Sequence, residues 1–296
     1  GIPANDIFLT STQLLDLKKL PSSLLIIGGG YIGCEFASIF SSFGVKVSII
    51  EMMPRILFNE DADISNEMTK LMQRQGVEIF AQSTVTKAEK NKVFFNCNGT
   101  EKSVEAEKIL IAIGLDPFFN KEEIKEIGVK SGSGIIINSR MQTSIDNIYA
   151  IGDVTDKIKL AHYAYAQADI AAKNIMGHKA EFDETVVPSA IFTIPEISSV
   201  GVRDGKLESA KFSFAASGKA RAMDEADGFV KIFYENGYLK GFCAIGPHAS
   251  DLVSEAALAI KNKIPLKDIK ETIHAHPTLS EAFLGAVEIA LEQSKK

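Results

Sequence analysis

A histidine and a carboxylate stand close together near the end of the chain, at His276 and Glu281. Pro277 follows the histidine and restricts the direction of the backbone between them. An imidazole titrates near neutral pH, so it can take up and return protons under working conditions. A carboxylate at its far nitrogen would fix the tautomer and stabilise the charged form. The spacing makes His276 and Glu281 candidates for a general acid–base pair.

The same residues also have a purely structural interpretation. Thr278 and Glu281 in front of an apolar run match the two ends of a capping box, in which Glu281 would only stabilise the start of a helix. A lone His-Pro pair is usually just a turn. The spacing alone leaves both interpretations open.

A glycine-rich turn near the other end of the chain is the second candidate. The apolar run 24–27 is typical of a buried strand and leads directly into the turn. A helical pattern follows, with Gly44 as its stop, and a second strand over 46–50 ends at Glu51. Strand, helix and acidic residue together give the context of a dinucleotide-binding turn, which disfavours a glycine turn without a ligand.

Each position in this turn has an expected role. Gly28 permits the tight turn, Gly30 lets the backbone approach a pyrophosphate, and Gly33 lets helix and strand pack closely. The N-terminus of the helix would face the phosphates. Glu51 stands where an acid accepts the ribose hydroxyls, which favours NAD over NADP.

Composition indicates a folded enzyme-like protein and excludes several classes. Of 296 residues, 46% are hydrophobic and 24% are charged, which are ordinary values for a protein with more than one core. The net charge of −6 and the lack of a basic cluster argue against a nucleic-acid partner. No apolar run approaches the roughly 20 residues that span a membrane, and no secretory signal opens the sequence.

The three cysteines favour a reducing compartment. Cys34, Cys97 and Cys243 are odd in number and far apart, so we expect neither a disulfide framework nor a metal site, and a cytoplasmic location. Cys34 would lie on the first turn of the phosphate-facing helix, where the pKa of a thiol can fall. Packing in the core is nevertheless the role that we expect for Cys34.

Regular elements are expected to position these residues. The apolar side chains of the first helix should share one face: Ile32, Phe36, Ile39, Phe40 and Phe43. Asn98-Gly99 is a strong hairpin signal. Further helices are predicted over 12–20, 61–75, 161–176, 249–261 and 280–292. Further strands are predicted over 77–80, 84–88, 93–97, 101–105, 108–113, 148–151, 197–202, 211–215, 229–234 and 239–245.

Several motifs in a fixed order resemble the flavin disulfide reductases, also called class I pyridine nucleotide-disulfide oxidoreductases. Within that family the likeness is greatest to the members that oxidise dihydrolipoamide. The matching runs cover essentially the whole chain: 24–51, 112–114, 148–154, 160–162, 187–189, 195–196, 228–231 and 274–283.

The resemblance implies an α/β fold of several parts. We expect a connecting segment over 1–22 and a Rossmann-like NAD-binding domain over 23–140. A short returning segment of the FAD domain would cover 141–186, and an α+β dimerisation domain would cover 187–296. In such a protein electrons pass from a dithiol to a redox disulfide, then to FAD and to NAD.

The resemblance also implies roles for single residues. His276 would be the base that acts on the dithiol across a homodimer interface, oriented by Glu281. Asp153 would hold the flavin ribityl chain, with Ala161 beside the isoalloxazine, although an Asp after a strand more often caps a turn. Tyr31 either gates the nicotinamide site or has no such role. The implied NAD pocket consists of Gly28, Gly29, Gly30, Tyr31, Ile32, Gly33, Glu35, Glu51, Val85 and Gly114.

Two features of the family are missing from this sequence. It contains no Cys-x-x-x-x-Cys pair and no second glycine-rich fingerprint for FAD. We therefore expect that a domain of roughly 150 residues is absent, and that FAD binds only with that N-terminal domain. The third domain also looks shortened between Val202 and Phe214.

Two hypotheses remain. In the first, the chain is the C-terminal part of an NAD-dependent oxidoreductase whose partner is the lipoyl domain of a 2-oxoacid dehydrogenase or glycine cleavage complex. In the second, it is a non-catalytic NAD-binding and dimerisation module. The first predicts an enzyme as the parent protein, and the second predicts no turnover by the chain alone.

Overall fold

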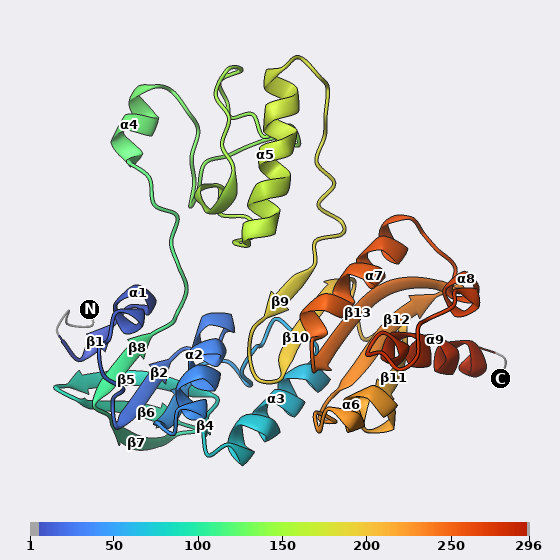
Figure 1. The fold of residues 1–296 in the computed structure, drawn as a ribbon. Coiled ribbons are helices and arrows are strands. Elements are labelled where there is room, and N and C mark those ends of the chain that lie inside the picture. Colours follow the sequence, from blue (N-terminus) through green and yellow to red (C-terminus); the bar gives the residue numbers. More distant parts are fainter. Residues whose placement is uncertain (1–5, 295–296) are drawn as a thin grey trace. The chain divides into compact units, whose positions relative to one another are not determined.

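The computed structural model describes residues 6–294 and contains two compact units (Figure 1). One unit is formed by residues 1–114 together with 188–296, and the other by residues 115–187. The extended run expected at residues 1–3 lies outside the described residues. The division of the chain into four parts remains a prediction.

A parallel sheet forms the centre of the first half of the larger unit. Its strand order is β1-β8-β2-β3-β4. The strands are β1 Phe8–Leu9, β2 Ser23–Ile27, β3 Lys46–Ile50, β4 Glu78–Phe80 and β8 Lys108–Ile111. Since all neighbours are parallel, the carboxyl ends of β2, β3 and β8 lie at one edge. The residues that follow these three strands, among them Gly28, Glu51 and Ala112, are thereby brought together.

The two faces of this sheet are buried by different partners. Leu24 and Ile26 of β2 face the helices α2 Tyr31–Ser42 and α3 Ala62–Arg74, whereas Leu25 and Ile27 face a small antiparallel sheet. Alternate residues point to opposite faces of a strand, so both sides of β2 must be apolar. The short helix α1 Ser11–Leu15 precedes β2.

The small antiparallel sheet contains β5 Ser83–Glu89, β6 Lys92–Cys97 and β7 Thr100–Glu105. Cys97 pairs with Thr100, and between them Asn98 and Gly99 both have positive φ, at 52° and 81°. A two-residue turn with this backbone matches the twist of its strands. The predicted hairpin is confirmed.

A five-stranded antiparallel sheet forms the second half of the unit, in the order β11-β12-β13-β10-β9. Its strands are β9 Ser189–Ile191, β10 Glu196–Gly201, β11 Glu208–Ser213, β12 Phe229–Glu235 and β13 Tyr238–Gly246. The helices are α6 Gly218–Ala222, α7 Ala249–Lys261, α8 Leu266–Glu271 and α9 Glu281–Gln293, with a 3-10 turn η2 at Phe214–Ala216. Phe242 of β13 packs edge-on against Phe283 of α9, with ring centroids 5.7 Å apart.

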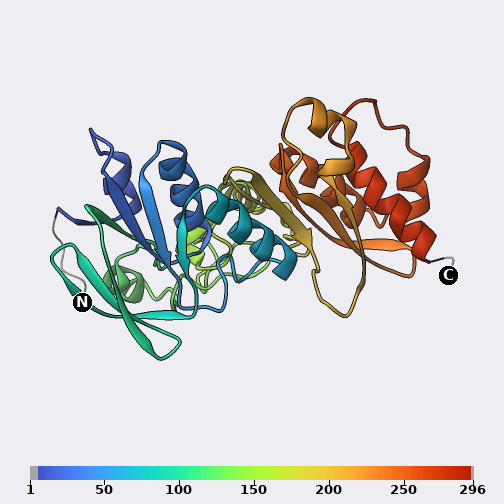
Figure 2. The ribbon, with the colours of Figure 1, turned by 90° about the horizontal axis from the view of Figure 1, so that it is seen from below.

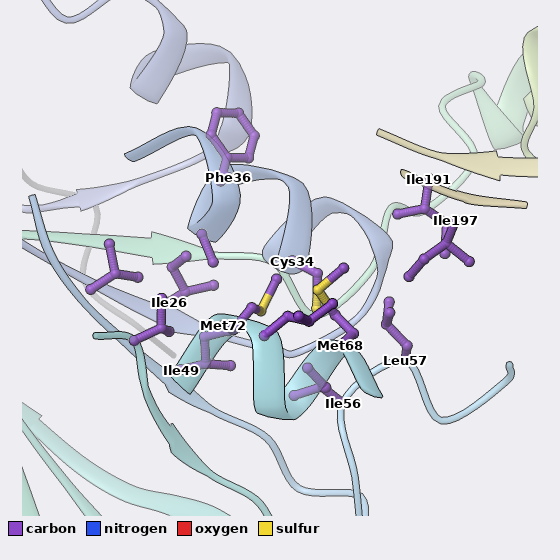
Figure 3. Close-up of a cluster of buried hydrophobic side chains, with 14 of the residues drawn as sticks. Ile26, Cys34, Phe36, Ile49, Ile56, Leu57, Met68, Met72, Ile191 and Ile197 are labelled. Carbon is purple, nitrogen blue, oxygen red and sulfur yellow. The ribbon is translucent and has the colours of Figure 1, made fainter. Parts of the chain in front are cut away.

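One hydrophobic core runs through both halves of this unit. Ile56 and Met68, beside and within α3, belong to the same buried cluster as Ile191 and Ile197 of the antiparallel sheet (Figure 3). Figure 2 shows α3 between the two sheets of the unit. Lys231 of β12 adds charge contacts at 3.0 Å to Asp61 and Asp63. The two halves therefore pack as one body.

The smaller unit, residues 115–187, has little regular structure. It contains α4 Lys121–Glu126, a 3-10 turn η1 at Gly152–Thr155 and the long helix α5 Ala161–Ile175. Its small core is centred on Val129, Ile135 and Ala150. Tyr165, Ile175 and Met176 of the α5 region are 76%, 64% and 77% exposed.

Several predicted elements are wrong or shifted. The strand predicted over 148–151 does not form: Tyr149 makes only an isolated bridge to Gln142, with no ladder beside it. The first helix ends at Leu15, with Asp16 as its C-cap, rather than near Leu20. The strand predicted over 211–215 ends at Ser213, where η2 begins, and that predicted over 108–113 ends at Ile111.

The buried face of α2 also differs from the predicted one. Phe36 and Phe40 are buried, but Ile39 and Phe43 are 40% and 65% exposed. The face centres instead on small residues such as Cys34 and Ala37, which let the helix approach the sheet closely. The spacing of the large apolar side chains therefore predicted the wrong buried face for α2.

Candidate functional site

The glycine-rich turn lies between β2 and α2, at the carboxyl edge of the parallel sheet. Gly28 has φ +107° and its amide donates to the carbonyl of Ile50 at 2.9 Å. A Cβ on Gly28 would lie 2.4 Å from the carbonyl oxygen of Ala112, and one on Gly33 would lie 2.0 Å from that of Gly28. Both positions exclude any side chain, as the turn requires.

The open side of the turn is at Gly30. This residue is the N-cap of α2, and no side chain caps the helix there. A Cβ on Gly30 would meet no atom within 4 Å. The first amides of α2 thus face free space, as needed for close approach of an anionic group.

Glu51 follows β3 and is held by two backbone amides. Its Oε2 accepts from the Gly29 amide and its Oε1 from the Met53 amide, each at 2.6 Å. Every carboxylate oxygen has two lone pairs, so each keeps one acceptor position. The structure places Glu51 directly against the glycine-rich turn.

Tyr31 is anchored by a carboxylate that the sequence did not suggest. Its hydroxyl donates to Oε1 of Glu60 at 2.7 Å. The side chain of Glu60 is fully buried, and its other oxygen is 3.6 Å from the guanidinium of Arg203. Burial, followed by the charge of Glu60, raises the pKa of Tyr31. Glu60 was missed because it lies in an irregular loop, where no periodic pattern marks a buried position.

The remaining residues of the implied NAD pocket lie on several different elements. Gly114 follows β8 with φ +121°, at the same edge of the sheet. Ile32 packs at the margin of the main core, and Val85 pairs with Phe95 in the antiparallel sheet. Glu35 accepts a hydrogen bond at 2.9 Å from the amide of Phe192, so its carboxylate ties α2 to the antiparallel half. Contact of these residues with a cofactor remains a prediction.

Cys34 is a core residue. It is fully buried, and its thiol lies 3.4 Å from the carbonyl of Gly29. Burial, with a smaller contribution from Glu51, raises the pKa of the thiol. The suggestion that the helix N-terminus lowers this pKa is wrong, because desolvation of the thiolate dominates.

Asp153 and Ala161 lie in the smaller unit. Asp153 is an exposed residue of η1, whose backbone carbonyl accepts from the Asp156 amide at 3.0 Å. Ala161 begins α5, whose N-cap Leu160 provides no capping side chain. The Gly152 amide donates to the buried Gln167 at 2.6 Å, which ties η1 to α5. Asp153 thus lies in the short turn η1 and Ala161 is the first residue of the long helix α5, and both residues are exposed.

The histidine and glutamate of the first motif are in contact. Nδ1 of His276 lies 2.9 Å from Oε1 of Glu281, and the ring is 78% exposed. The Thr278 amide donates to Oε2 of Glu281 at 2.8 Å. This amide and, next, the His276 contact lower the pKa of Glu281.

The capping-box interpretation is met only in part. Glu281 does accept from the Thr278 amide, but the N-cap of α9 is Ser280, and the Thr278 hydroxyl donates to the Ala275 carbonyl. Glu281 therefore has one oxygen for the backbone and one for the histidine. Glu281 thereby links the start of α9 to both Thr278 and His276.

A groove of about 620 Å³ is lined by none of the predicted site residues. It lies between the end of α3, at Arg74, and the loop before β10, where Phe192 and Ile194 are exposed. Among the described residues there is no cluster of histidine, cysteine and acidic side chains suited to a metal ion. No described helix has the length and apolar character to cross a membrane.

Comparison with known proteins identifies two family domains. Residues 3–168 match the pyridine nucleotide-disulphide oxidoreductase domain, and residues 187–287 match the dimerisation domain of the same family. This family uses FAD and NAD. The antiparallel half of the larger unit thus corresponds to a dimerisation domain.

Relatives with a curated name point to the same family. The chain is 42% identical to the dihydrolipoyl dehydrogenase of Chlamydia trachomatis serovar D over 303 residues, which is 96% of this chain and 63% of the relative. It is 37% identical to the dihydrolipoyl dehydrogenase of Geobacillus stearothermophilus, over 96% of this chain and 63% of that protein. The chain spans less than two thirds of the length of these relatives.

Solved structures share the fold. The HOCl-induced flavoprotein disulfide reductase RclA from Escherichia coli superposes with a TM-score of 0.88 at 26% identity, over 98% of this chain and 69% of that one. LpdA from Mycobacterium tuberculosis gives 0.87 at 27% identity, over 97% and 65%. With two matching domains and relatives above 30% identity, the chain belongs to the pyridine nucleotide-disulphide oxidoreductase family.

Proposed function

We propose that this chain is the NAD-binding and dimerisation part of a dihydrolipoyl dehydrogenase. The parent protein would oxidise dihydrolipoamide and pass electrons through a disulfide and FAD to NAD. The contact of His276 with Glu281 is the observation that carries this proposal. The names of the relatives support the choice of substrate.

The proton acceptor in this proposal is His276. A carboxylate only accepts hydrogen bonds, so the contact with Glu281 requires that Nδ1 of His276 carries the proton. Nε2 then has a free lone pair on an exposed ring. In that state His276 takes the proton of a dihydrolipoamide thiol, and the resulting thiolate is the nucleophile for the disulfide.

The nucleotide preference is proposed to rest on Glu51. Its carboxylate is fixed by two amides and keeps acceptor positions for ribose hydroxyls. A 2′-phosphate would face this charge, and two like charges about 4 Å apart repel by roughly 1–4 kcal/mol between water and a protein surface. The chain should therefore bind NAD(H) in preference to NADP(H).

The residues for FAD fit the group only in part. FAD, when bound, supplies the electron relay between disulfide and nicotinamide. Uncapped amides at the start of α5 suit a polar acceptor, and Asp153 suits the ribityl hydroxyls. Because these residues form only a rim, we infer that further residues are needed to hold FAD.

The partners and location complete the proposal. The match of residues 187–287 to a dimerisation domain supports a homodimer, in which His276 would serve the disulfide of the other subunit. The substrate would be a lipoyl domain of a 2-oxoacid dehydrogenase or glycine cleavage complex. Three unpaired cysteines agree with a cytoplasmic location.

Calorimetry with NADH and NADPH tests the nucleotide site directly. The wild-type chain should bind NADH at least about ten times more tightly, equivalent to ~1.4 kcal/mol. Glu51→Arg should narrow or reverse this preference. Glu107→Gln is the control, since Glu107 precedes β8 at the opposite edge of the sheet. Equal affinity of the wild-type chain for the two nucleotides would refute the role of Glu51.

Reconstitution with an N-terminal domain from a relative tests the catalytic assignment. The chain alone should show no flavin absorbance, because it contributes only a rim of the FAD site, and no lipoamide oxidation, because its sequence has no Cys-x-x-x-x-Cys pair. After addition of an N-terminal domain from a close relative, His276→Ala should lower turnover by roughly 10²–10⁴-fold. Unchanged turnover of that variant would remove His276 from the mechanism. The non-catalytic alternative predicts no turnover under either condition.

A further inference from the structure

A second histidine–carboxylate pair lies two residues before the first. His274 is on the irregular segment between α8 and α9, but its side chain is only 5% exposed. Nε2 of His274 lies 2.9 Å from Oε1 of Glu255 on α7, and Nδ1 lies 2.9 Å from the carbonyl oxygen of Thr272. Both ring nitrogens of this histidine are therefore engaged.

The two partners of His274 determine its proton count. A backbone carbonyl and a carboxylate are both acceptors, so each ring nitrogen must donate. A neutral imidazole has one N–H, and only the imidazolium has two.

His276 differs in its surroundings. Only its Nδ1 has a partner given by the structure, Glu281, and its ring is open to solvent. One N–H satisfies this arrangement and leaves Nε2 free. Two histidines separated by a single alanine thus have hydrogen-bond environments that require different numbers of protons.

We propose that His274 is a positioning residue for His276: a doubly protonated ring that anchors the segment 272–280 to α7 through Glu255. This inference rests on the proposed role of His276 as the base. The neighbours of His274 on the segment are strongly exposed, with Ile273 at 97%, so His274 is the buried point by which the segment is attached.

The charge of His274 also reaches the first pair. The charged group in contact with His274 is Glu255 of α7, at 2.9 Å. Among the causes that lower the pKa of Glu281, after the Thr278 amide and the His276 contact, is the charge of His274. An ionised Glu281 is the state that holds Nδ1–H of His276 and leaves Nε2 free. A positive charge on His274 therefore favours the ionised form of Glu281.

Nitrogen NMR of the chain, labelled with ¹⁵N-histidine and held at pH 7, tests the proposal without catalysis. The chain has five histidines, which makes assignment by single substitution practical. We expect two N–H signals for His274, and one protonated Nδ1 with a bare Nε2 for His276. A bare nitrogen on wild-type His274 would overturn the proposed charge state.

Matched variants separate charge from anchoring. Glu255→Gln replaces the anion with a side chain of the same shape, so His274 should lose one of its two N–H signals. In His274→Ala the two ring nitrogens of His276 should give averaged signals of the two tautomers, and amide exchange over 275–280 should be at least tenfold faster. His248→Ala is the control. His248 is 58% exposed, and its contact with Asp251 in the first turn of α7 is long, at 3.7 Å. An unchanged His276 spectrum in His274→Ala would overturn the positioning role.

The same data distinguish this inference from the proposed function. If His276 is not the base, the reconstituted His276→Ala enzyme keeps its turnover, but the two N–H signals of His274 are still seen. If His276 is the base and His274 does not position it, turnover falls in His276→Ala while the His274→Ala spectrum of His276 remains that of the wild type.

Discussion

The glycine-rich turn and the segment 272–280 both hold functional groups on irregular backbone, but by opposite means. In the turn, backbone packs on backbone: a Cβ on Gly33 would lie 2.0 Å from the Gly28 carbonyl. In the segment, side chains make the contacts, through His274, Thr278 and Glu281. The turn has no room for adjustment, whereas the segment is tied at a few separate points.

This difference predicts how each region responds to change. A close-packed backbone fails as a whole when one atom is added, because its neighbours cannot move independently. A segment held by separate hydrogen bonds loses only the contribution of each bond that is removed. Substitutions in the turn should therefore have large effects on stability, and those in the segment small ones.

The largest effect is expected for Gly33→Ala. The added methyl group must displace the Gly28 backbone, and overpacking of this kind costs about 3 kcal/mol. Urea unfolding would show the loss of stability, and calorimetry should show loss of NADH binding. Gly30→Ala is the matched control, because its Cβ meets nothing within 4 Å. Its stability should stay within ~1 kcal/mol of the wild type while NADH affinity falls. Equal stability of both variants would contradict the comparison.

An intermediate, pH-dependent effect is expected for Glu281→Gln. The Thr278 amide and His276 hold the pKa of Glu281 below its usual range. A lowered pKa stabilises the folded chain above the unfolded value of about 4.3, and this stability is lost as the pH falls through the folded value. The wild type should melt about 2–4 °C higher than the variant at pH 7. Thermal scans should show this difference vanish on acidification, and a difference that stays constant down to pH 3 would be inconsistent with it.

The smallest effect is expected for Thr278→Val. This change removes the bond from the Thr278 hydroxyl to the Ala275 carbonyl at 2.7 Å but keeps the amide that binds Glu281. The loss of stability should be at most ~0.5–1 kcal/mol. Hydrogen exchange should quicken over 275–280 and not in the glycine-rich turn. Protection lost throughout the chain would show that the segment is as tightly coupled as the turn.

The sequence predicted the parts of the fold that follow a period. The run 24–27, the helix near 61–75 and the hairpin at Asn98-Gly99 appear close to their expected places. The short helices α4, α6 and α8 have six residues or fewer, too few to show a helical period. The strand expected over 148–151 was wrong because its apolar residues find no neighbouring strand among those the structure describes.

The candidate site was predictable only as far as residue type and spacing decide it. His276 and Glu281 are in contact as expected, and Glu51 lies against the turn. The Tyr31–Glu60 and His274–Glu255 contacts join residues 29 and 19 positions apart, across loops that carry no pattern. Such pairs depend on tertiary packing, which a single sequence does not reveal.

The core shared by α3 and the antiparallel sheet holds the larger unit together, although this unit consists of two segments that are not continuous in the sequence. Residues 115–187 are an excursion that leaves the larger unit at Gly114 and returns at Pro188. A protease that cleaves this excursion, for instance beside Phe118, whose side chain is 99% exposed, would cut the chain into two fragments. The fragments would nevertheless remain together, since Ile56 and Met68 on one are buried against Ile191 and Ile197 on the other. A single peak in size-exclusion chromatography would therefore not show that the polypeptide is uncleaved.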